Sequence, residues 1–180
     1  VWSSKLPGQK FLRLFSMKMG ENDKNLWNVP NLLTQKFPAP NFVASTKVKL
    51  TPEDAKEGKT AGLLVMGMDY ASIVITNKTD GYYVQLRKAE KAEKGGEEKV
   101  LFETKLKSNE AYFKVNVNEP NGICTFSYSE NGKNFIKVGE PFQAKPGKWI
   151  GAKVGLYSIS TQKANRGGYA DFEYFRIKKN

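Results

Sequence analysis

The sequence contains no histidine, one cysteine and no long apolar run. Without histidine, Ser-His-Asp and Cys-His catalysis are excluded, and zinc loses one of its principal ligands. Cys124 has no second cysteine for an internal disulfide, which leaves the redox compartment undecided. No stretch approaches the about 18 apolar residues of a membrane-spanning helix, so we expect no membrane partner.

A glycine-rich phosphate loop is also missing, because no glycine cluster follows a strand-like run and opens a helix. Nucleotide chemistry is therefore not expected. Several glycines stand instead inside apolar runs, where glycine marks a bulge or close sheet packing: Gly62, Gly67, Gly151 and Gly155.

The 180 residues have an ordinary globular composition, with 39% hydrophobic and 26% charged residues. A chain of this length can bury roughly 70% of its unfolded surface in one core. We find no internal repeat and no linker, and we interpret residues 1–180 as a single domain. The chain starts abruptly at Val1-Trp2, which suggests a mature product or a fragment of a longer protein, and we expect the latter.

The net charge of +11 raises the question of nucleic acid or another anionic partner. The lysines do not cluster, however, and aromatic residues are not interleaved with them as in a nucleic-acid binder. They recur at alternating positions of the strand-like runs, as on solvated sheet faces: Lys47, Lys49, Lys105, Lys107, Lys114 and Lys137. We therefore expect no nucleic-acid partner, while an acidic polysaccharide remains open.

Short strand-like runs at spacings near ten residues fill most of the chain, and no long helical pattern occurs. This predicts an all-β fold, a two-sheet antiparallel β-sandwich of the jelly-roll type. Residues 61–68 and 70–76 are apolar enough for burial on both faces, and Asn131-Gly132 predicts a hairpin. The runs are 11–17, 41–50, 61–68, 70–76, 81–88, 99–106, 111–118, 123–129, 134–144, 149–158 and 169–177.

Four local features test this interpretation. Residues 51–60, with Thr51 as a helix cap and Pro52 behind it, predict a loop with one short helical turn. Residues 88–99 predict a solvated hairpin tip that reverses at Gly95-Gly96. The mixed apolar positions of 169–177 favour a strand covered on both faces. Trp149 and Cys124 are expected in the core.

The candidate pair for carboxylate catalysis is Asp171 and Glu173, which alternate on one strand as acidic residues do in sandwich-fold glucanases. Glycoside hydrolysis needs an acid and a base or nucleophile at a set separation, and only two members of the usual three-residue run occur here. The structural alternative is that Asp171 anchors the preceding loop or helps to hold a structural calcium ion. No other cofactor is expected.

Sugar binding requires exposed aromatic faces with polar groups around them. The sequence alone leaves open whether each candidate is a platform or a core residue: Trp27, Tyr83, Tyr112, Tyr157 and Tyr169.

An ordered set of phrases resembles a known family: NLLTQKF, TAGLLV, FSYSENGKNFIKVGEPF, KWIGAKVGLYS and GGYADFEYFRI. Together they resemble the concanavalin A-like β-sandwich at the C-terminus of β-xylosidases of glycoside hydrolase family 43. The usual opening of that family, an acidic-Phe phrase followed by a Trp-rich strand, is missing or reduced to VWSS. The resemblance implies a non-catalytic accessory domain beside a catalytic five-bladed propeller that hydrolyses xylosides or arabinofuranosides.

The resemblance also implies partners and a site. They are xylan- or arabinan-type glycans and the propeller of the same parent chain, in a bacterial periplasm or outside the cell, with the cytoplasm left open. In some such enzymes the sandwich lends an aromatic to the active-site rim, which here points to Tyr157 and the connection that reaches Arg166. We therefore expect an accessory domain that stabilises its enzyme or shapes substrate access; the alternatives are a free-standing carbohydrate-binding module and a glucanase.

Overall fold

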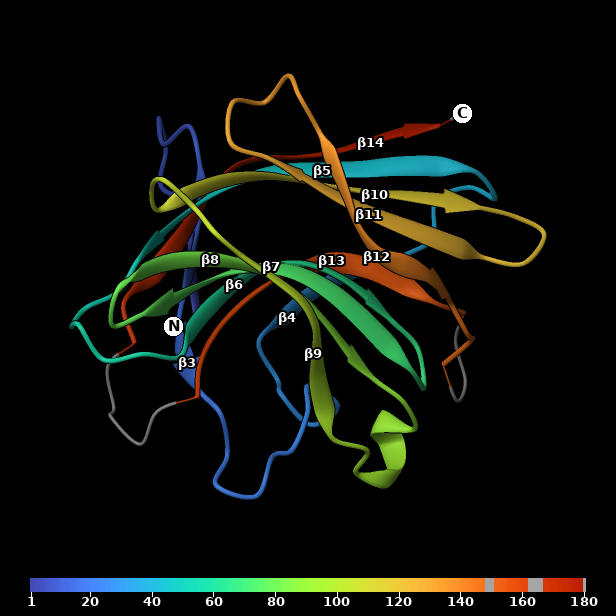
Figure 1. Ribbon diagram of the computed structural model, residues 1–180, viewed down its shortest axis with the longest axis horizontal. Helices are drawn as coiled ribbons and strands as arrows, with labels where there is room; N and C mark the ends of the chain where they lie inside the picture. The colour runs from blue at the N-terminus through green and yellow to red at the C-terminus, as the bar shows by residue number, and fades with distance from the viewer. Residues whose placement is uncertain (148–150, 162–166, 180) are drawn as a thin grey trace.

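Two antiparallel sheets stacked face to face make up the protein (Figure 1). The computed structural model describes residues 1–147, 151–161 and 167–179. Sheet A contains, in spatial order, β1 (Ser3–Ser4), β2 (Leu12–Phe15), β14 (Tyr169–Lys179), β5 (Phe42–Thr51), β10 (Glu110–Asn118), β11 (Ile123–Ser129) and β12 (Ile136–Gln143). The β-sandwich expected from the sequence is confirmed.

Sheet B lies below sheet A in Figure 1 and contains β3 (Met17–Lys18), β13 (Lys153–Ser160), β6 (Lys59–Met66), β7 (Tyr70–Lys78), β8 (Gly81–Ala89) and β9 (Glu98–Lys105). β4 (Leu32–Lys36) and β3 share the edge of β13 that faces away from β6. Among the described pairings, only β3 with β13 is parallel. No described helix is long and apolar enough to cross a bilayer.

The main core lies between the sheets and follows from strict alternation along the sheet A strands. β5 turns every second residue inward, and its inward side chains are fully buried: Phe42, Ala44, Thr46, Val48 and Leu50. β10 does the same, with Val115 directly opposite Ala44. Cys124 is buried in this core, as expected, and its burial raises the pKa of the thiol to about 12.

A second core covers the outer face of sheet B. β6 and β7 are buried on both faces, as their near-continuous apolar runs predict. The connection from β3 to β4 passes below sheet B (Figure 1) and places Leu26 and Val29 against Leu64, Val74 and Ile159. Sheet B is therefore an internal layer, with the sandwich core above it and this segment, residues 19–31, below it.

Two of the strand glycines are required by close backbone approach. A Cβ on Gly62 would lie 2.1 Å from the carbonyl oxygen of Ile73, and a Cβ on Gly155 would lie 2.1 Å from that of Leu33. Both positions therefore exclude a side chain, which agrees with the predicted role of these glycines in close sheet packing.

The helical turn predicted within residues 51–60 is wrong. Thr51 is the last residue of β5, and the following residues form bends up to Lys59. The reason is Lys59, which is fully buried. Its ammonium donates to the Lys56 carbonyl at 2.7 Å and to the Asp54 carboxylate, so the loop turns its acceptors toward this cation instead of forming a helical turn.

The hairpin between β8 and β9 reverses near Gly95 as predicted, but its tip is not simply solvated. Ala92–Lys94 forms a 3₁₀ turn, and Ala92 is buried in the second core. The side chain of Asn25 donates to the carbonyls of Ala92 and Gly96, at 3.0 and 2.6 Å. Segment 19–31 thus fastens the tip to sheet B.

The prediction that the last strand is covered on both faces is wrong. β14 has a bulge between Phe172 and Tyr174, which adds one residue and exchanges the inward and outward parities. Ala170 and Phe172 point inward before the bulge, and Phe175 and Ile177 after it, so a half-exposed strand shows apolar residues at odd and even positions.

The first predicted strand, 11–17, is divided between the sheets. β2 pairs with β14 in sheet A, whereas β3 pairs with β13 in sheet B. Ser16 stands at the crossing point, where its hydroxyl lies 2.8 Å from that of Ser158. Trp149, expected in the core, lies outside the described residues.

Candidate functional site

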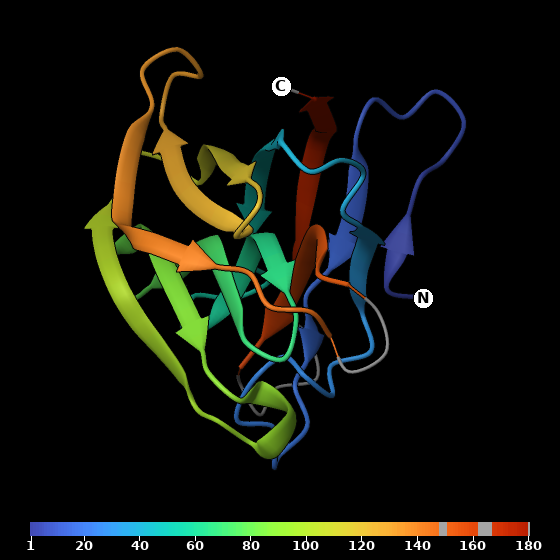
Figure 2. The same ribbon diagram turned by 90° about the vertical axis from the view of Figure 1, so that its right-hand side faces the viewer.

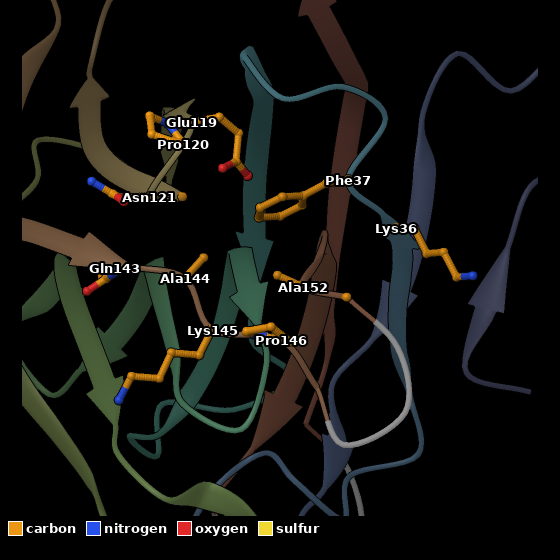
Figure 3. A pocket seen from close by; sticks show the side chains of 12 residues that line it. Lys36, Phe37, Glu119, Pro120, Asn121, Gln143, Ala144, Lys145, Pro146 and Ala152 are labelled. Atoms are coloured by element: carbon orange, nitrogen blue, oxygen red, sulfur yellow. The ribbon is translucent and has the colours of Figure 1, made fainter.

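A pocket of about 580 Å³ opens at the end of the sandwich where β13 begins (Figure 3). It lies between the end of β4, the β10–β11 turn and the segment that follows β12. Its apolar lining includes Phe37, Pro120, Ala144 and Pro146, and its polar lining includes Lys36, Glu119, Asn121, Gln143 and Lys145. Its size and mixed lining are those of a small-molecule or side-chain pocket.

The pocket wall is built from turns whose geometry is held locally. Phe37 projects its ring toward the pocket, supported edge-on by Phe42 at 5.1 Å. The peptide bond before Pro120 is cis, and the backbone N–H of Glu119 donates to the Asn41 side chain at 2.9 Å. An apolar floor with carboxylate, amide and ammonium groups around it can hold a polar partner or a loop.

A second, polar pocket of about 610 Å³ lies at the other end of β13, beside Thr161. Residues 18–25 form most of its wall, and Glu98 of β9 completes it. The connection from β13 to β14 begins here. This is the region in which the resemblance placed the active-site rim.

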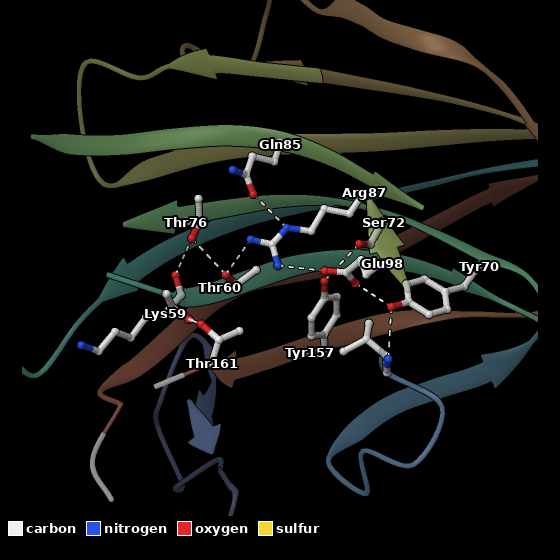
Figure 4. A network of polar contacts seen from close by, with 12 residues as sticks. Lys59, Thr60, Tyr70, Ser72, Thr76, Gln85, Arg87, Glu98, Tyr157 and Thr161 are labelled. Atoms are coloured by element: carbon white, nitrogen blue, oxygen red, sulfur yellow. Dashed lines mark hydrogen bonds and ion pairs between the residues drawn. The ribbon is translucent and has the colours of Figure 1, made fainter. Parts of the chain in front are cut away.

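The outer face of sheet B, which segment 19–31 covers, carries a buried polar network centred on Arg87 (Figure 4). Its guanidinium donates to Gln85 at 2.8 Å, to Glu98 at 3.1 Å and to the Thr60 hydroxyl at 3.2 Å. The side chains of Arg87 and Glu98 are only 11% and 18% exposed. This ion pair joins β8 to β9 and is largely removed from water.

Two tyrosines complete the network. Tyr70 donates to Glu98 at 2.6 Å and accepts the backbone N–H of Leu26, so it connects the network to segment 19–31. The Tyr157 hydroxyl lies 3.0 Å from that of Ser72. Burial raises the pKa of both phenols, and the nearby charge of Glu98 raises them further. Both phenols are therefore neutral structural groups.

Tyr157, expected at the active-site rim, is fully buried. Its ring packs in the second core among Leu26, Val74 and Ile159. No face of the ring is accessible, so it cannot stack on a sugar in this structure. Tyr157 points to the outer side of sheet B, and segment 19–31 covers that side. Arg166, the other rim candidate, lies outside the described residues.

The other aromatic candidates are partly exposed, and they are not brought together. Trp27 lies in segment 19–31 and packs against the second core. Tyr83 lies on β8 between Lys78 and Lys105, whose ammonium nitrogens are 4.7 and 5.8 Å from its ring centre, and donates to Asp80. Tyr112 and Tyr169 stand on the outer face of sheet A, where cations lie over their rings.

Asp171 and Glu173 are directed to different neighbours. Asp171 accepts two hydrogen bonds from Arg13 of β2, at 2.7 and 2.9 Å. Glu173 is the extra residue of the β14 bulge and binds Lys47 of β5 at 2.5 Å. Each carboxylate therefore has its own cation, one on each of the two strands that flank β14. An acid and a base that share one substrate are not arranged in this way.

The Asp171 carboxylate is also the predicted calcium ligand. In the described part of the chain, no three acidic or other metal-ligating side chains gather at one point. Because both carboxylate oxygens serve Arg13, a calcium ion would compete with this ion pair. The calcium site stays a prediction.

Sequence reasoning missed the Arg87–Glu98 network. A signal was present, because Gln85 and Arg87 are polar residues on a sheet face that is otherwise apolar. The sequence does not show, however, that segment 19–31 covers this face and buries it. Glu98 lies within residues 88–99, for which the sequence predicts a solvated hairpin tip, so its burial was not expected.

Comparisons with known proteins agree with this architecture. Residues 2–178 match the family model of the β-xylosidase C-terminal concanavalin A-like domain. No match is found among curated protein sequences.

Three solved structures with a similar fold differ in length. The chain superposes on a bifunctional GH43-CE protein from Bacteroides eggerthii with a TM-score of 0.82 and 24% identity, covering 99% of this chain and 22% of that one. It superposes on a xylan β-1,4-xylosidase from Bacillus halodurans C-125 with a TM-score of 0.76 and 20% identity, covering 99% of this chain and 34% of that one. It superposes on a functionally unknown protein from Saccharomyces cerevisiae with a TM-score of 0.68 and 12% identity, covering 99% of this chain and 91% of that one. At these identities the likeness shows the fold alone.

Proposed function

The chain belongs to the family of β-xylosidase C-terminal concanavalin A-like domains, and from this premise we propose that it is the non-catalytic accessory domain of a family 43 glycoside hydrolase. In this role it docks against a catalytic propeller of the same parent polypeptide, stabilises it and shapes access to its active site. The substrates of the parent are xylan- or arabinan-type glycans, in the periplasm or outside the cell of a bacterium.

The observation that carries this proposal is the relation between family and length. The chain matches its family model from residue 2 to 178, yet it spans only 22% and 34% of two GH43 relatives of known structure. Most of each relative therefore lies outside the part that this chain resembles. This supports a division of labour in which the catalytic groups belong to another domain.

The carboxylates of β14 support the same assignment. A glycosidase acid must hold a proton while its partner is ionised, which requires two carboxyl groups in different environments beside one substrate. Asp171 and Glu173 are instead matched singly to Arg13 and Lys47. Each is used as a structural anion.

The first test measures hydrolysis by the purified chain. We expect no turnover of nitrophenyl β-xyloside or nitrophenyl α-arabinofuranoside above that of a heat-inactivated sample. Turnover that disappears in Glu173→Gln would assign catalysis to this domain and overturn the proposal.

The second test asks which end of the sandwich faces the propeller. We propose the polar-pocket end, because the β13–β14 connection begins there at Thr161. Glu21 is exposed at this pocket, and Glu119 is exposed at the opposite pocket. In the longer polypeptide, Glu21→Lys should lower kcat/KM or the melting temperature, while the matched Glu119→Lys should not. Equal effects of the two variants, or none, would remove this orientation.

A second candidate is binding of neutral sugars by this domain, favoured by the partly exposed Tyr83 with the polar groups of Asp80, Lys78 and Lys105 around it. It predicts millimolar or tighter binding of xylan oligosaccharides that weakens in Tyr83→Ala. Flat calorimetric titrations of the unmodified chain against xylo- and arabino-oligosaccharides would dismiss it.

A further inference from the structure

A single line of residues crosses the outer face of sheet A at right angles to the strands. The register places Lys137, Ser127, Lys114, Ser45 and Arg176 opposite one another on β12, β11, β10, β5 and β14. We call these five residues the transverse row. Cations and serines alternate along it, one residue per strand.

The spacing of the row is set by the sheet. Neighbouring strands lie about 4.8 Å apart, so cations on every second strand start about 10 Å apart. All three cations leave the face away from the sandwich core, since their neighbours along the strands, such as Val115 and Val138, point inward. The row therefore presents evenly spaced positive charges along an extended line.

These three cations differ from three others on the same face. Arg13 is paired with Asp171, Lys47 with Glu173, and Lys49 with Glu110. Among the residues that the structure describes, no carboxylate forms an ion pair with Lys114, Lys137 or Arg176. The charge of the row is thus available to an external anion.

Aromatic rings contact two of the cations. The Lys114 ammonium lies 3.7 Å from the ring centre of Phe135, and the Arg176 guanidinium lies 4.2 Å from that of Tyr174. These contacts restrict long side chains that would otherwise move freely, which lowers the entropy cost of binding. In each contact the cation takes up one ring face on which a base of a single-stranded nucleic acid could stack.

The serines supply the second recognition element. Ser45 and Ser127 are half-buried between the cations, and neither hydroxyl has a hydrogen-bond partner among the described residues. A small hydroxyl between two long cations leaves room for a ligand to approach the sheet. It can donate to, and accept from, a ligand hydroxyl.

One border of the row is built by the β11–β12 turn, which projects from the top of the molecule in Figure 1 and at the upper left in Figure 2. Gly132 in this turn packs against the ring of Tyr112, the neighbour of Lys114 two positions back along β10. Hydrogen bonds from the backbone of Lys133 and Asn134 to the Asn131 side chain hold the turn in shape. The row therefore lies beside an ordered wall.

We propose that the transverse row binds a linear polysaccharide that carries carboxylate groups, such as a uronate-containing chain. Carboxylates pair with the ammonium and guanidinium groups, and sugar hydroxyls exchange hydrogen bonds with the serines. Because the ligand lies on sheet A and away from both pockets, this binding is independent of the accessory role: it is measured on the chain alone, whereas docking is measured in the longer polypeptide.

The test is affinity electrophoresis and calorimetry with polygalacturonate as the uronate probe. The row variant is Lys114→Gln with Arg176→Gln, and the matched control is Lys94→Gln with Lys99→Gln, two exposed lysines outside the row. Both variants lower the net charge equally. We expect the row variant to bind polygalacturonate about tenfold more weakly and the control to bind as the unmodified chain does.

Three further measurements complete the design. Methyl-esterified polygalacturonate, whose carboxyl groups carry no charge, should not bind, and Ser45→Val should weaken binding severalfold while the melting temperature stays constant. Equal losses in the row and control variants would mean attraction by net charge alone and would overturn the proposal. A single-stranded DNA that binds more tightly than polygalacturonate, with the same dependence on the row, would also overturn it.

Discussion

The two outer faces of the sandwich use the same kinds of side chain in opposite ways. On the outer face of sheet B, Arg87, Glu98 and Tyr157 lie beneath segment 19–31 and satisfy one another. On the outer face of sheet A, Arg176 lies over the ring of Tyr174, and this pair remains open to water. We call these the covered face and the open face.

The difference shows that a covering segment, more than residue type, decides what a polar side chain does. On the covered face an unpaired group cannot turn to water, so each must have an internal partner. On the open face water satisfies any group left unpaired, and a cation can stay free for a ligand. Substitutions should therefore be costly on one face and mild on the other.

The largest effect is expected for Glu98→Gln on the covered face. The change removes the charge opposite Arg87, and we expect it to lower the free energy of unfolding by about 3 kcal/mol. The matched Glu173→Gln on the open face should cost less than about 1 kcal/mol, because Lys47 then turns to water. Urea denaturation measures both. Equal costs would remove the distinction between the faces.

A smaller effect is expected for Tyr157→Phe. The variant keeps the ring but leaves the fully buried Ser72 hydroxyl without its partner, which should lower the free energy of unfolding by about 2 kcal/mol. Tyr174→Phe is the control, since its hydroxyl has no partner among the described residues. Thermal unfolding should separate the two, and a control as unstable as Tyr157→Phe would contradict the comparison.

Arg13→Gln tests the strongest ion pair of the open face. Arg13 binds both oxygens of Asp171 and lies 3.6 Å from the ring centre of Tyr169, and its hydrogen bond to Asp171 raises its pKa. Its side chain is 28% exposed, so we expect a loss of about 1 kcal/mol. If urea denaturation shows a loss of unfolding free energy as large as that of Glu98→Gln, water does not satisfy unpaired groups on this face, and the comparison fails.

The smallest effect concerns pH. Hydrogen bonds from Lys78, and then from Gln85, hold the pKa of Glu103 below its usual value. The ionised carboxylate therefore stabilises the folded state above its unfolded pKa of about 4.3, and this contribution is lost as pH falls through the lower folded pKa.

Glu103→Gln should flatten the acid limb of the stability profile by less than about 1 kcal/mol, because the site is partly exposed. Urea midpoints between about pH 6 and pH 3 measure the change. Glu119→Gln, whose carboxylate has no ion-pair partner among the described residues, is the control. An unchanged acid limb in Glu103→Gln would contradict the prediction.

The fold was predictable where one face of a strand is buried and the other is wet. β5 and β10 alternate without interruption, and their sequences identify the inward residues one by one. β14 could not be interpreted in this way, because the bulge at Glu173 exchanges its faces. Residues 51–60 misled for another reason: the buried ammonium of Lys59 binds the Asp54 carboxylate and the Lys56 carbonyl, and the loop that brings these acceptors to it is not helical.

The site was less predictable than the fold. Tyr157 was expected at an active-site rim, but it is fully buried, because its access depends on residues more than 120 positions earlier. The transverse row was invisible for the same reason. Its lysines are scattered in the chain, and only the register of five strands places them in one line.

The sequence by itself determined the all-β class, the family and the side of the sheet that most residues occupy, because these depend on local alternation and ordered phrases. Only the tertiary structure decided which outer face is covered, which tyrosines are closed to a ligand and which cations keep a free charge. The physical reason is that strand periodicity specifies the direction of a side chain, whereas burial and pairing depend on what another segment brings to meet it.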